Sequence, residues 1–211
     1  MSQPAQSPSP WRTMSLGRLK WVAVVLVIGA TAVFGGLDAA DRVTPVAMGQ
    51  SYDDGPLRIT PRSASLPAEV TGLASLSGQC RFLTVDATVE NVADRSVALP
   101  NALPVVGTDA DCSGPRPSTI SGVIGIQGIP AYFKSALRIR DGQAMPTVEP
   151  GFTTDYRFVW AVPAADLARH PQITARMPAM SEFVSTFRIA EDFGADDDTY
   201  GEVDLTPEVN R

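Results

Sequence analysis

The feature that most constrains this chain is an uncharged apolar run from Trp21 to Leu37, WVAVVLVIGATAVFGGL. A helix rises about 1.5 Å per residue, so the run would cover about 26 Å, close to the roughly 30 Å hydrocarbon core of a bilayer. Basic residues precede it and acidic residues follow it: Arg12, Arg18, Lys20, Asp38 and Asp41. Because Lys and Arg beside a membrane helix resist translocation, the run predicts a transmembrane signal-anchor helix with its N-terminus in the cytoplasm.

This anchor divides the chain into an inner and an outer part. Residues 1–20 are polar and rich in Ser and Pro, which is typical of a disordered cytoplasmic tail. Residues 38–211 would then be extracytoplasmic at the cell membrane, with residues 21–37 in contact with the lipid bilayer. Two alternatives stay open: a buried helix of a soluble protein, and a cleaved signal peptide, for which Ala30-Thr31-Ala32 offers a small-x-small cleavage site inside the run.

The charge balance argues against nucleic acid as a partner. Three of the 17 basic residues precede the apolar run, which leaves 14 against 23 acidic residues in the outer part. A nucleic-acid interface needs excess basic charge to displace counterions. The acidity is concentrated from Glu191 onward, where eight acidic residues are opposed only by Arg211. We therefore interpret residues 191–211 as an acidic disordered tail.

The outer part contains two cysteines, Cys80 and Cys112. An even number of cysteines in an oxidising compartment indicates a disulfide, so we predict that these two are joined. The alternative is a pair of buried thiols. Metal binding by two cysteines and one histidine at these spacings is disfavoured.

Short runs of alternating apolar residues predict β-strands. The clearest strand is expected from Cys80 to Val92, with one apolar face directed to a core: Leu83, Val85, Ala87 and Val89. A second long strand is expected from Phe152 to Val162, and its larger residues share one face: Tyr156, Phe158, Trp160 and Val162. We expect these two faces to meet across the core together with Phe187.

Turn signals separate further short runs. Asp54-Gly55-Pro56 precedes a strand expected at 57–61 and ended by Pro61, and Asp141-Gly142 and Glu149-Pro150-Gly151 are two more turns. Other strands are expected at 119–129, 136–140, 173–177 and 183–189, with one helical turn at 164–170. About seven or eight short strands predict an all-β fold, an antiparallel immunoglobulin-like β-sandwich over residues 55–190, joined to the anchor by an extended stalk at 38–54.

Three stretches carry a resemblance to a known kind of domain: GPLRITPRSASL, FLTVDATVENVADRSVAL and VEPGFTTDYRFVWAVP. They contain a Val-x-Asn strand end at Val89-Glu90-Asn91, and a Pro150-Gly151 turn before an aromatic strand that ends in Val162-Pro163. Preceded by a membrane segment, this pattern resembles the extracellular immunoglobulin-like domains of unknown function of Gram-positive and actinobacterial membrane-anchored surface proteins. The resemblance covers about residues 55–190, implies the fold, and brings no catalytic residues with it.

No stretch of the sequence matches a catalytic, cofactor or metal motif. His170 is the only histidine and lies in a predicted loop, and no Gly-x-Ser-x-Gly is present. Gly122, Gly125 and Gly128 lack the Lys-Ser/Thr of a phosphate loop, so a kinked strand is favoured. On an EF-hand template Pro207 would occupy the position of the bidentate Glu. Its candidate ligands are therefore assigned to a solvated tail: Asp192, Asp196, Asp197, Asp198 and Glu202.

These observations favour a non-enzymatic binding or scaffold module at the cell surface, with no cofactor and no catalytic or metal-binding residues. This module is the leading hypothesis, and one form of it is an accessory subunit beside another membrane or envelope protein, such as a transporter. Two other hypotheses stay open: a cell-envelope enzyme whose site is not recognised, and a secreted antigen-like protein released by signal cleavage.

Overall fold

The computed structural model describes residues 20–22, 42–99, 112, 123–144, 147–170, 172–185 and 190–207. The chain divides into two compact units, Met1–Ala40 and Asp41–Arg211. In the first unit, residues 20–22 are helical, and the rest of the predicted tail and anchor lies outside the described residues. Over the part of the chain that is described, no helix combines the length and apolar character needed to cross a membrane.

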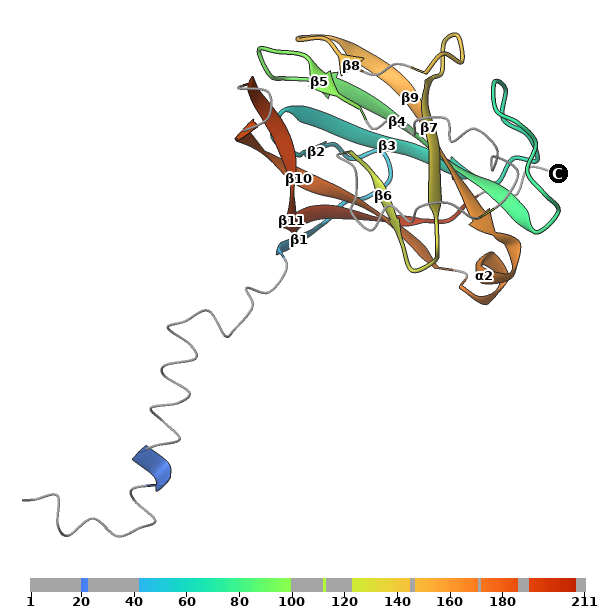
Figure 1. The fold of residues 1–211 in the computed structure, drawn as a ribbon, viewed down its shortest axis with the longest axis horizontal. Coiled ribbons are helices and arrows are strands. Elements are labelled where there is room, and N and C mark those ends of the chain that lie inside the picture. The colour runs from blue at the N-terminus through green and yellow to red at the C-terminus, as the bar shows by residue number, and fades with distance from the viewer. Residues whose placement is uncertain are drawn as a thin grey trace, which may run out of the picture. The chain divides into compact units, whose positions relative to one another are not determined.

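One sheet of the second unit has five antiparallel strands in the order β2-β3-β4-β9-β7 (Figure 1). Their bounds are Tyr52–Asp53 for β2, Leu57–Ser65 for β3, Cys80–Asn91 for β4, Thr153–Pro163 for β9 and Tyr132–Arg138 for β7. β4 and β9 pair without a break from Cys80 opposite Pro163 to Glu90 opposite Thr153. Both long strands predicted from the alternation are therefore confirmed.

The second sheet has the order β1-β11-β10-β6, and a small third sheet pairs β5 with β8. Their bounds are Arg42–Pro45 for β1, Ala190–Leu205 for β11, Ile173–Ser185 for β10, Gly125–Gln127 for β6, Val97–Ala98 for β5 and Thr147–Val148 for β8. β10 and β11 form a long antiparallel hairpin, and β1 runs parallel to β11. The short helix α2, Ala164–Arg169, follows β9 at the predicted helical turn.

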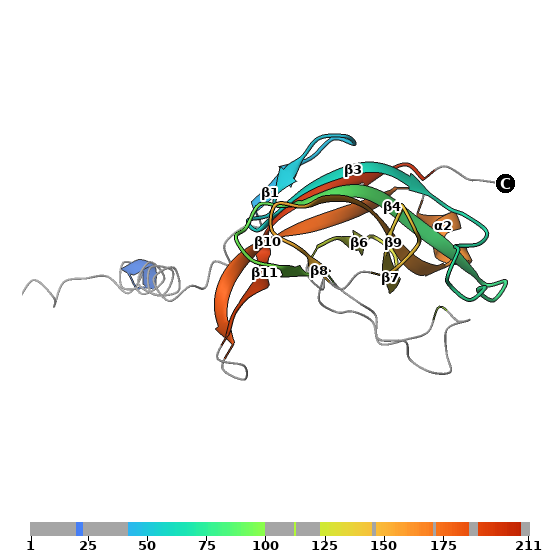
Figure 2. The same cartoon turned by 90° about the horizontal axis from the view of Figure 1, so that it is seen from above.

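The five-stranded sheet and the β10–β11 sheet pack face to face and enclose one main core (Figure 2). Alternate residues of each strand enter it, because successive side chains of a strand point to opposite faces. The buried members include Val85 and Val89 from β4, Phe158 and Trp160 from β9, Ala175 and Met177 from β10, and Val203 and Leu205 from β11. The rings of Phe158 and Trp160 are stacked with centroids 6.3 Å apart. The architecture is a β-sandwich, as predicted. The expectation that the apolar faces of the two long strands meet across the core is wrong, because β4 and β9 are neighbours in the same sheet and Val85 pairs with Phe158. Phe187 lies outside the described residues.

A second, smaller core lies on the other face of the five-stranded sheet. Phe82 and Val159 are buried there with Val70 and Leu137, and Leu73 and Leu76 pack against them. The segment between β3 and β4 supplies Val70, Leu73 and Leu76, so it covers this end of the sheet. Both faces of β4 and β9 are consequently apolar near Cys80, which explains the nearly continuous apolar letters in that part of each strand.

Asn91, the last residue of β4, connects this strand to the small third sheet. Its buried side chain donates from Nδ2 to the carbonyl oxygens of Arg95 and Val148, at 2.8 and 2.7 Å, and Oδ1 accepts from the Ala93 N–H at 2.9 Å. A buried polar group with all these partners costs little to bury and fixes the turn that follows.

Two predicted segments are wrong. Residues 190–205, placed mostly in a disordered acidic tail at 191–211, form β11. Towards the end of β11, Glu202 and Asp204 alternate with Val203 and Leu205, which are buried, so the acidic composition concealed a half-buried strand. The predicted stalk at 38–54 contains β1 and β2. These short strands raise the number in the described residues above the seven or eight predicted.

The predicted end of a strand at Pro61 is also wrong. β3 continues to Ser65, past a shift in its pairing with β4 between Pro61 and Ser63. A proline is tolerated at such an irregularity because no ladder hydrogen bond is required of it there. The Asp54-Gly55-Pro56, Asp141-Gly142 and Glu149-Pro150-Gly151 turns are confirmed, and each contains a glycine with positive φ.

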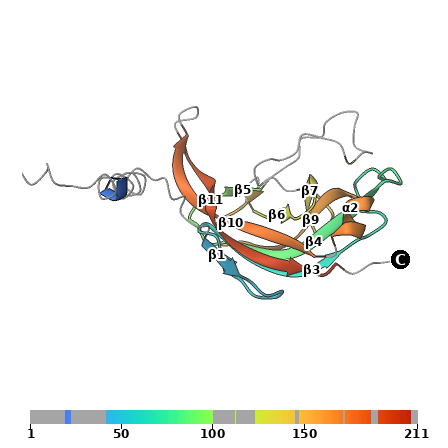
Figure 3. The same ribbon diagram turned by 90° about the horizontal axis from the view of Figure 1, so that it is seen from below.

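Beyond the sandwich core, β10 and β11 continue as a two-stranded ribbon (Figure 3). Its base is a shift in pairing between Pro178 and Ala179, after which Ala179 pairs with Asp196 and Ser185 with Ala190. We call residues 179–185 and 190–196 the arm.

Candidate functional site

The predicted disulfide is present. Cys80 and Cys112 are joined with an S–S distance of 2.03 Å across a sequence separation of 32. Cys80 is the first residue of β4 and is buried, and its Sγ also accepts a hydrogen bond from the Cys112 N–H at 2.8 Å. The bond therefore holds Cys112 to the end of the central strand.

The structure does not gather the other chemically interesting residues into one place. His170 is exposed at the end of α2, where its N–H donates to the Asp166 carbonyl oxygen at 3.0 Å. Gly125 lies in β6 and Gly128 in the turn after it, whereas Gly122 lies outside the described residues. Across the described residues, no group of three or more His, Cys, Asp and Glu side chains is arranged to hold a metal ion.

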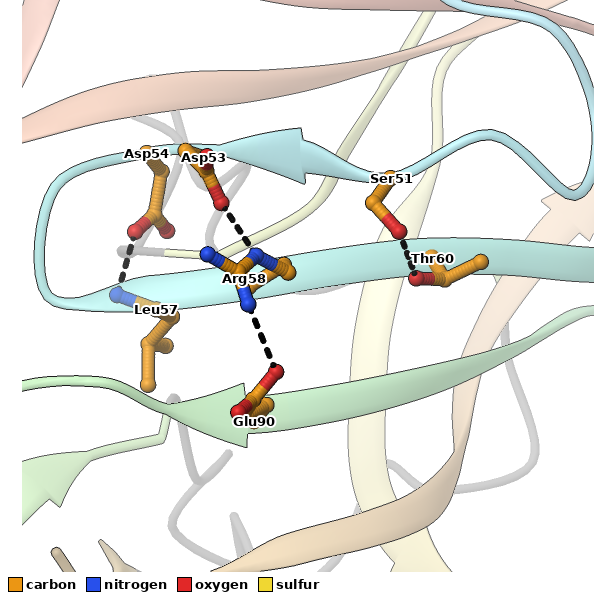
Figure 4. A network of polar contacts seen from close by, with 7 residues as sticks. All are labelled: Ser51, Asp53, Asp54, Leu57, Arg58, Thr60 and Glu90. Carbon is orange, nitrogen blue, oxygen red and sulfur yellow. Dashed lines mark hydrogen bonds and ion pairs between the residues drawn. The ribbon is translucent and has the colours of Figure 1, made fainter. Parts of the chain in front are cut away.

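The outward face of the five-stranded sheet, away from the main core, carries polar side chains that pair with one another (Figure 4). Arg58 lies between two carboxylates, with its Nε 2.7 Å from Asp53 Oδ1 and its Nη1 3.1 Å from Glu90 Oε2. The hydroxyls of Ser51, just before β2, and of Thr60 in β3 are 2.8 Å apart.

The pairing continues across β4 and β9. Arg157 donates to both oxygens of Asp86, at 2.7 and 2.8 Å, and this contact raises the pKa of Arg157. Thr88 donates to Asp155 at 2.6 Å. Because acids neutralise these arginines, the face is a solvated surface of matched charge and does not present the excess positive charge that nucleic acid or phosphate requires.

A shallow groove of about 240 Å³ lies where β1 meets β11. It is lined by Val43, Pro45, Val46, Ala47, Met48, Glu202 and Asp204. Val43 and Met48 are 45% and 39% exposed, so two large apolar side chains with accessible surface line the same groove. Glu202 is held by Arg176 at 2.9 Å, whereas Asp204 is exposed and has no hydrogen bond or ion pair among the residues described. Apolar walls with one free carboxylate suit contact with another protein better than bond-making chemistry.

The most unusual titratable group is Asp54, in the turn between β2 and β3. It is 1% exposed, and its Oδ1 accepts the Leu57 N–H at 2.7 Å (Figure 4). Its Oδ2 is buried and has no hydrogen-bond partner among the residues that the structure describes. The pKa of Asp54 is raised to about 7, chiefly by burial; the Leu57 N–H lowers it and the charge of Asp53 adds to the rise.

Sequence reasoning did not find either feature. The groove residues fell in the predicted stalk and tail, and Asp54 was interpreted only as a turn former. One available signal was the apolar period of two at Val203 and Leu205, which extends the strand pattern through the acidic stretch.

A search of solved structures finds a match to an uncharacterized beta-sandwich protein from Clostridium difficile 630. The identity is 10%, the TM-score is 0.45, and the match covers 80% of this chain and 97% of that chain. No protein-family model matches the chain, and a search of curated proteins finds no match. The β-sandwich assignment therefore rests on the two sheets and the core between them.

Proposed function

We propose that this chain is a single-pass membrane protein that displays its β-sandwich outside the cytoplasm as a non-enzymatic binding or scaffold module. The observation that carries the proposal is the uncharged run Trp21–Leu37 with basic residues on its N-terminal side. The Cys80–Cys112 disulfide supports the same location, because disulfides persist in oxidising compartments.

The groove between β1 and β11 is the surface we assign to the partner. Val43, one of its exposed apolar residues, is the sixth residue after Leu37, so the groove follows the membrane segment closely in the chain. A partner in the same membrane or envelope, such as a transporter subunit, fits this arrangement.

The anchor is tested by membrane fractionation combined with N-terminal sequencing. We expect the intact chain in the membrane fraction after alkaline washing. A mature protein that begins between Thr31 and Gly36 would mean that the run is a cleaved signal peptide.

The partner is tested by site-specific crosslinking in intact cells. A photoreactive p-benzoylphenylalanine replaces Met48 in the groove. A matched variant carries it at Ile139, an exposed apolar residue that directly follows β7 of the five-stranded sheet. We expect one stoichiometric membrane protein to be crosslinked from Met48 and not from Ile139. Equal crosslinking from both positions, or none from Met48, contradicts the assignment of the groove.

A further inference from the structure

The turn between β2 and β3 joins the two sheets at the base of the arm. The main-chain oxygen of Asp54 accepts the Met180 N–H at 2.5 Å. The next residue, Gly55, has a φ of +117°, and a Cβ there would lie 2.5 Å from the Met180 oxygen. Met180 belongs to β10, two residues beyond the shift in pairing at Pro178. The turn is therefore in direct backbone contact with the strand that leaves the core as the arm.

A neighbouring contact holds the same two parts together. The Tyr52 ring of β2 packs on Gly201 of β11, where a Cβ would lie 2.8 Å from two ring carbons. β2 and the turn after it thus touch both strands of the hairpin, one through Tyr52 and the other through Asp54. We call the contacts of Asp54 and Gly55 with Met180 the clasp.

The carboxyl group of Asp54 faces no counter-charge in the described part of the chain. Among the described residues no Arg, Lys or His forms an ion pair with Asp54, and the nearest arginine on β3, Arg58, is occupied by Asp53 and Glu90. The titratable groups that face it are themselves acidic or neutral. The charge of Asp53 raises the pKa of Asp54. The pKa of Tyr52 is raised by burial, by the charge of Asp54 and by that of Asp196, which lies in β11. From β10 the contacting residue, Met180, carries no charge.

We propose that Asp54 is a protonation switch: its neutral carboxyl keeps the clasp closed on the base of the arm, and its ionisation favours an open clasp. Burial removes hydration that the Leu57 N–H replaces at only one of the two carboxylate oxygens, and this loss costs the charged form more than the protonated form. Opening lets water reach the group, so the open form ionises in the ordinary range.

The pH window follows from the two pKa values. The pKa of Asp54 is about 7 with the clasp closed, against an ordinary value of 3.8. Below about pH 4 both forms are protonated and the clasp has its full stability. Between these values the open form loses its proton and the closed form retains it, so opening becomes more favourable as pH rises. Above about pH 7 both forms are ionised and the dependence levels off.

Amide hydrogen exchange of the full-length chain tests the switch, with the Met180 N–H as the reporter. After correction for intrinsic exchange, we expect its opening constant to rise about fifty-fold from pH 5 to pH 7, and only about twofold more by pH 8. Asp54→Asn keeps the oxygen that accepts the Leu57 N–H but cannot ionise, so its opening constant should stay constant over this range. The matched control Asp53→Asn, which removes an exposed carboxyl next to it, should keep the rise.

Two results would overturn the proposal: an opening constant at Met180 that does not change with pH in the wild type, or an equal rise in Asp54→Asn. A carboxyl ¹³C titration of the wild-type chain gives a second test that needs no variant. A midpoint for Asp54 near pH 7 supports the switch, and a midpoint below pH 5 refutes it.

Discussion

Removing the Cys80–Cys112 disulfide should lower the free energy of unfolding of the sandwich unit by about 4 kcal/mol. The bond closes a loop with a sequence separation of 32. In the chain-entropy model a loop of this length reduces the entropy of the unfolded chain by about 12 cal/mol/K, which is about 3.7 kcal/mol at 25 °C. Because Cys80 begins the central strand β4 and is buried, the cross-link joins Cys112 to the packed five-stranded sheet.

The assay is equilibrium urea unfolding of the full-length chain, followed by the fluorescence of the buried Trp160. The double variant Cys80→Ala, Cys112→Ala should show the lower midpoint without added reductant. When reductant is present, the free energy of unfolding of the wild type should fall by a similar amount. The single variant Cys112→Ala separates the loss of the bond from the loss of the buried Cys80 side chain.

Reductant provides the internal control, because it should leave the double variant unchanged. Either of two results would contradict the entropic reasoning. The first is a free energy of unfolding of the double variant that lies less than about 1 kcal/mol below that of the wild type, and the second is a wild-type unfolding midpoint that does not change with reductant. A similar loss with a steeper dependence on urea would support it, since the uncrosslinked chain exposes more surface when it unfolds.

Three further predictions concern packing and surface charge. Gly201→Ala should lower the free energy of unfolding by about 2 kcal/mol, because the new Cβ would overlap the Tyr52 ring. Gly78→Ala is the control, since a Cβ there would meet open space; equal effects of the two variants in thermal unfolding would refute the prediction. Trp160→Ala should cost about 4 kcal/mol in urea unfolding, because the indole is 2% exposed in the main core; a cost under 1 kcal/mol would mean that the site is not packed as described. Asp86→Asn should cost only about 1 kcal/mol and less at high salt, because the ion pair it breaks is partly exposed, and a loss that does not change with salt would argue against an electrostatic origin.

The strands that sequence analysis located correctly are those whose own residues carry the pattern. In β4 and β9 apolar residues recur at every second position, and this period is set by the geometry of an extended backbone whatever the partner strand is. The turn at Asp54-Gly55-Pro56 could be found for a similar reason, since the demand for a positive φ is met by Gly55 itself.

The errors lie where a neighbour far away in the chain decides the outcome. The acidic stretch after Glu191 has the composition of a solvated tail, and it is ordered as β11 because it pairs with β10 on one side and with β1 on the other. Charged residues are tolerated in such a strand when they occupy the outward positions and the apolar residues Val203 and Leu205 face the core.

By itself the sequence determined the apolar run before the domain, the all-β class, the two long strands and the cysteine pair, because each depends on residue type and local spacing. Only the tertiary structure decided that Asp54 is buried against Met180, that β1 and β11 form a groove, and that the acidic C-terminal stretch belongs to a sheet. Burial and pairing are properties of two chain segments that meet in space, so the composition of one segment cannot specify them.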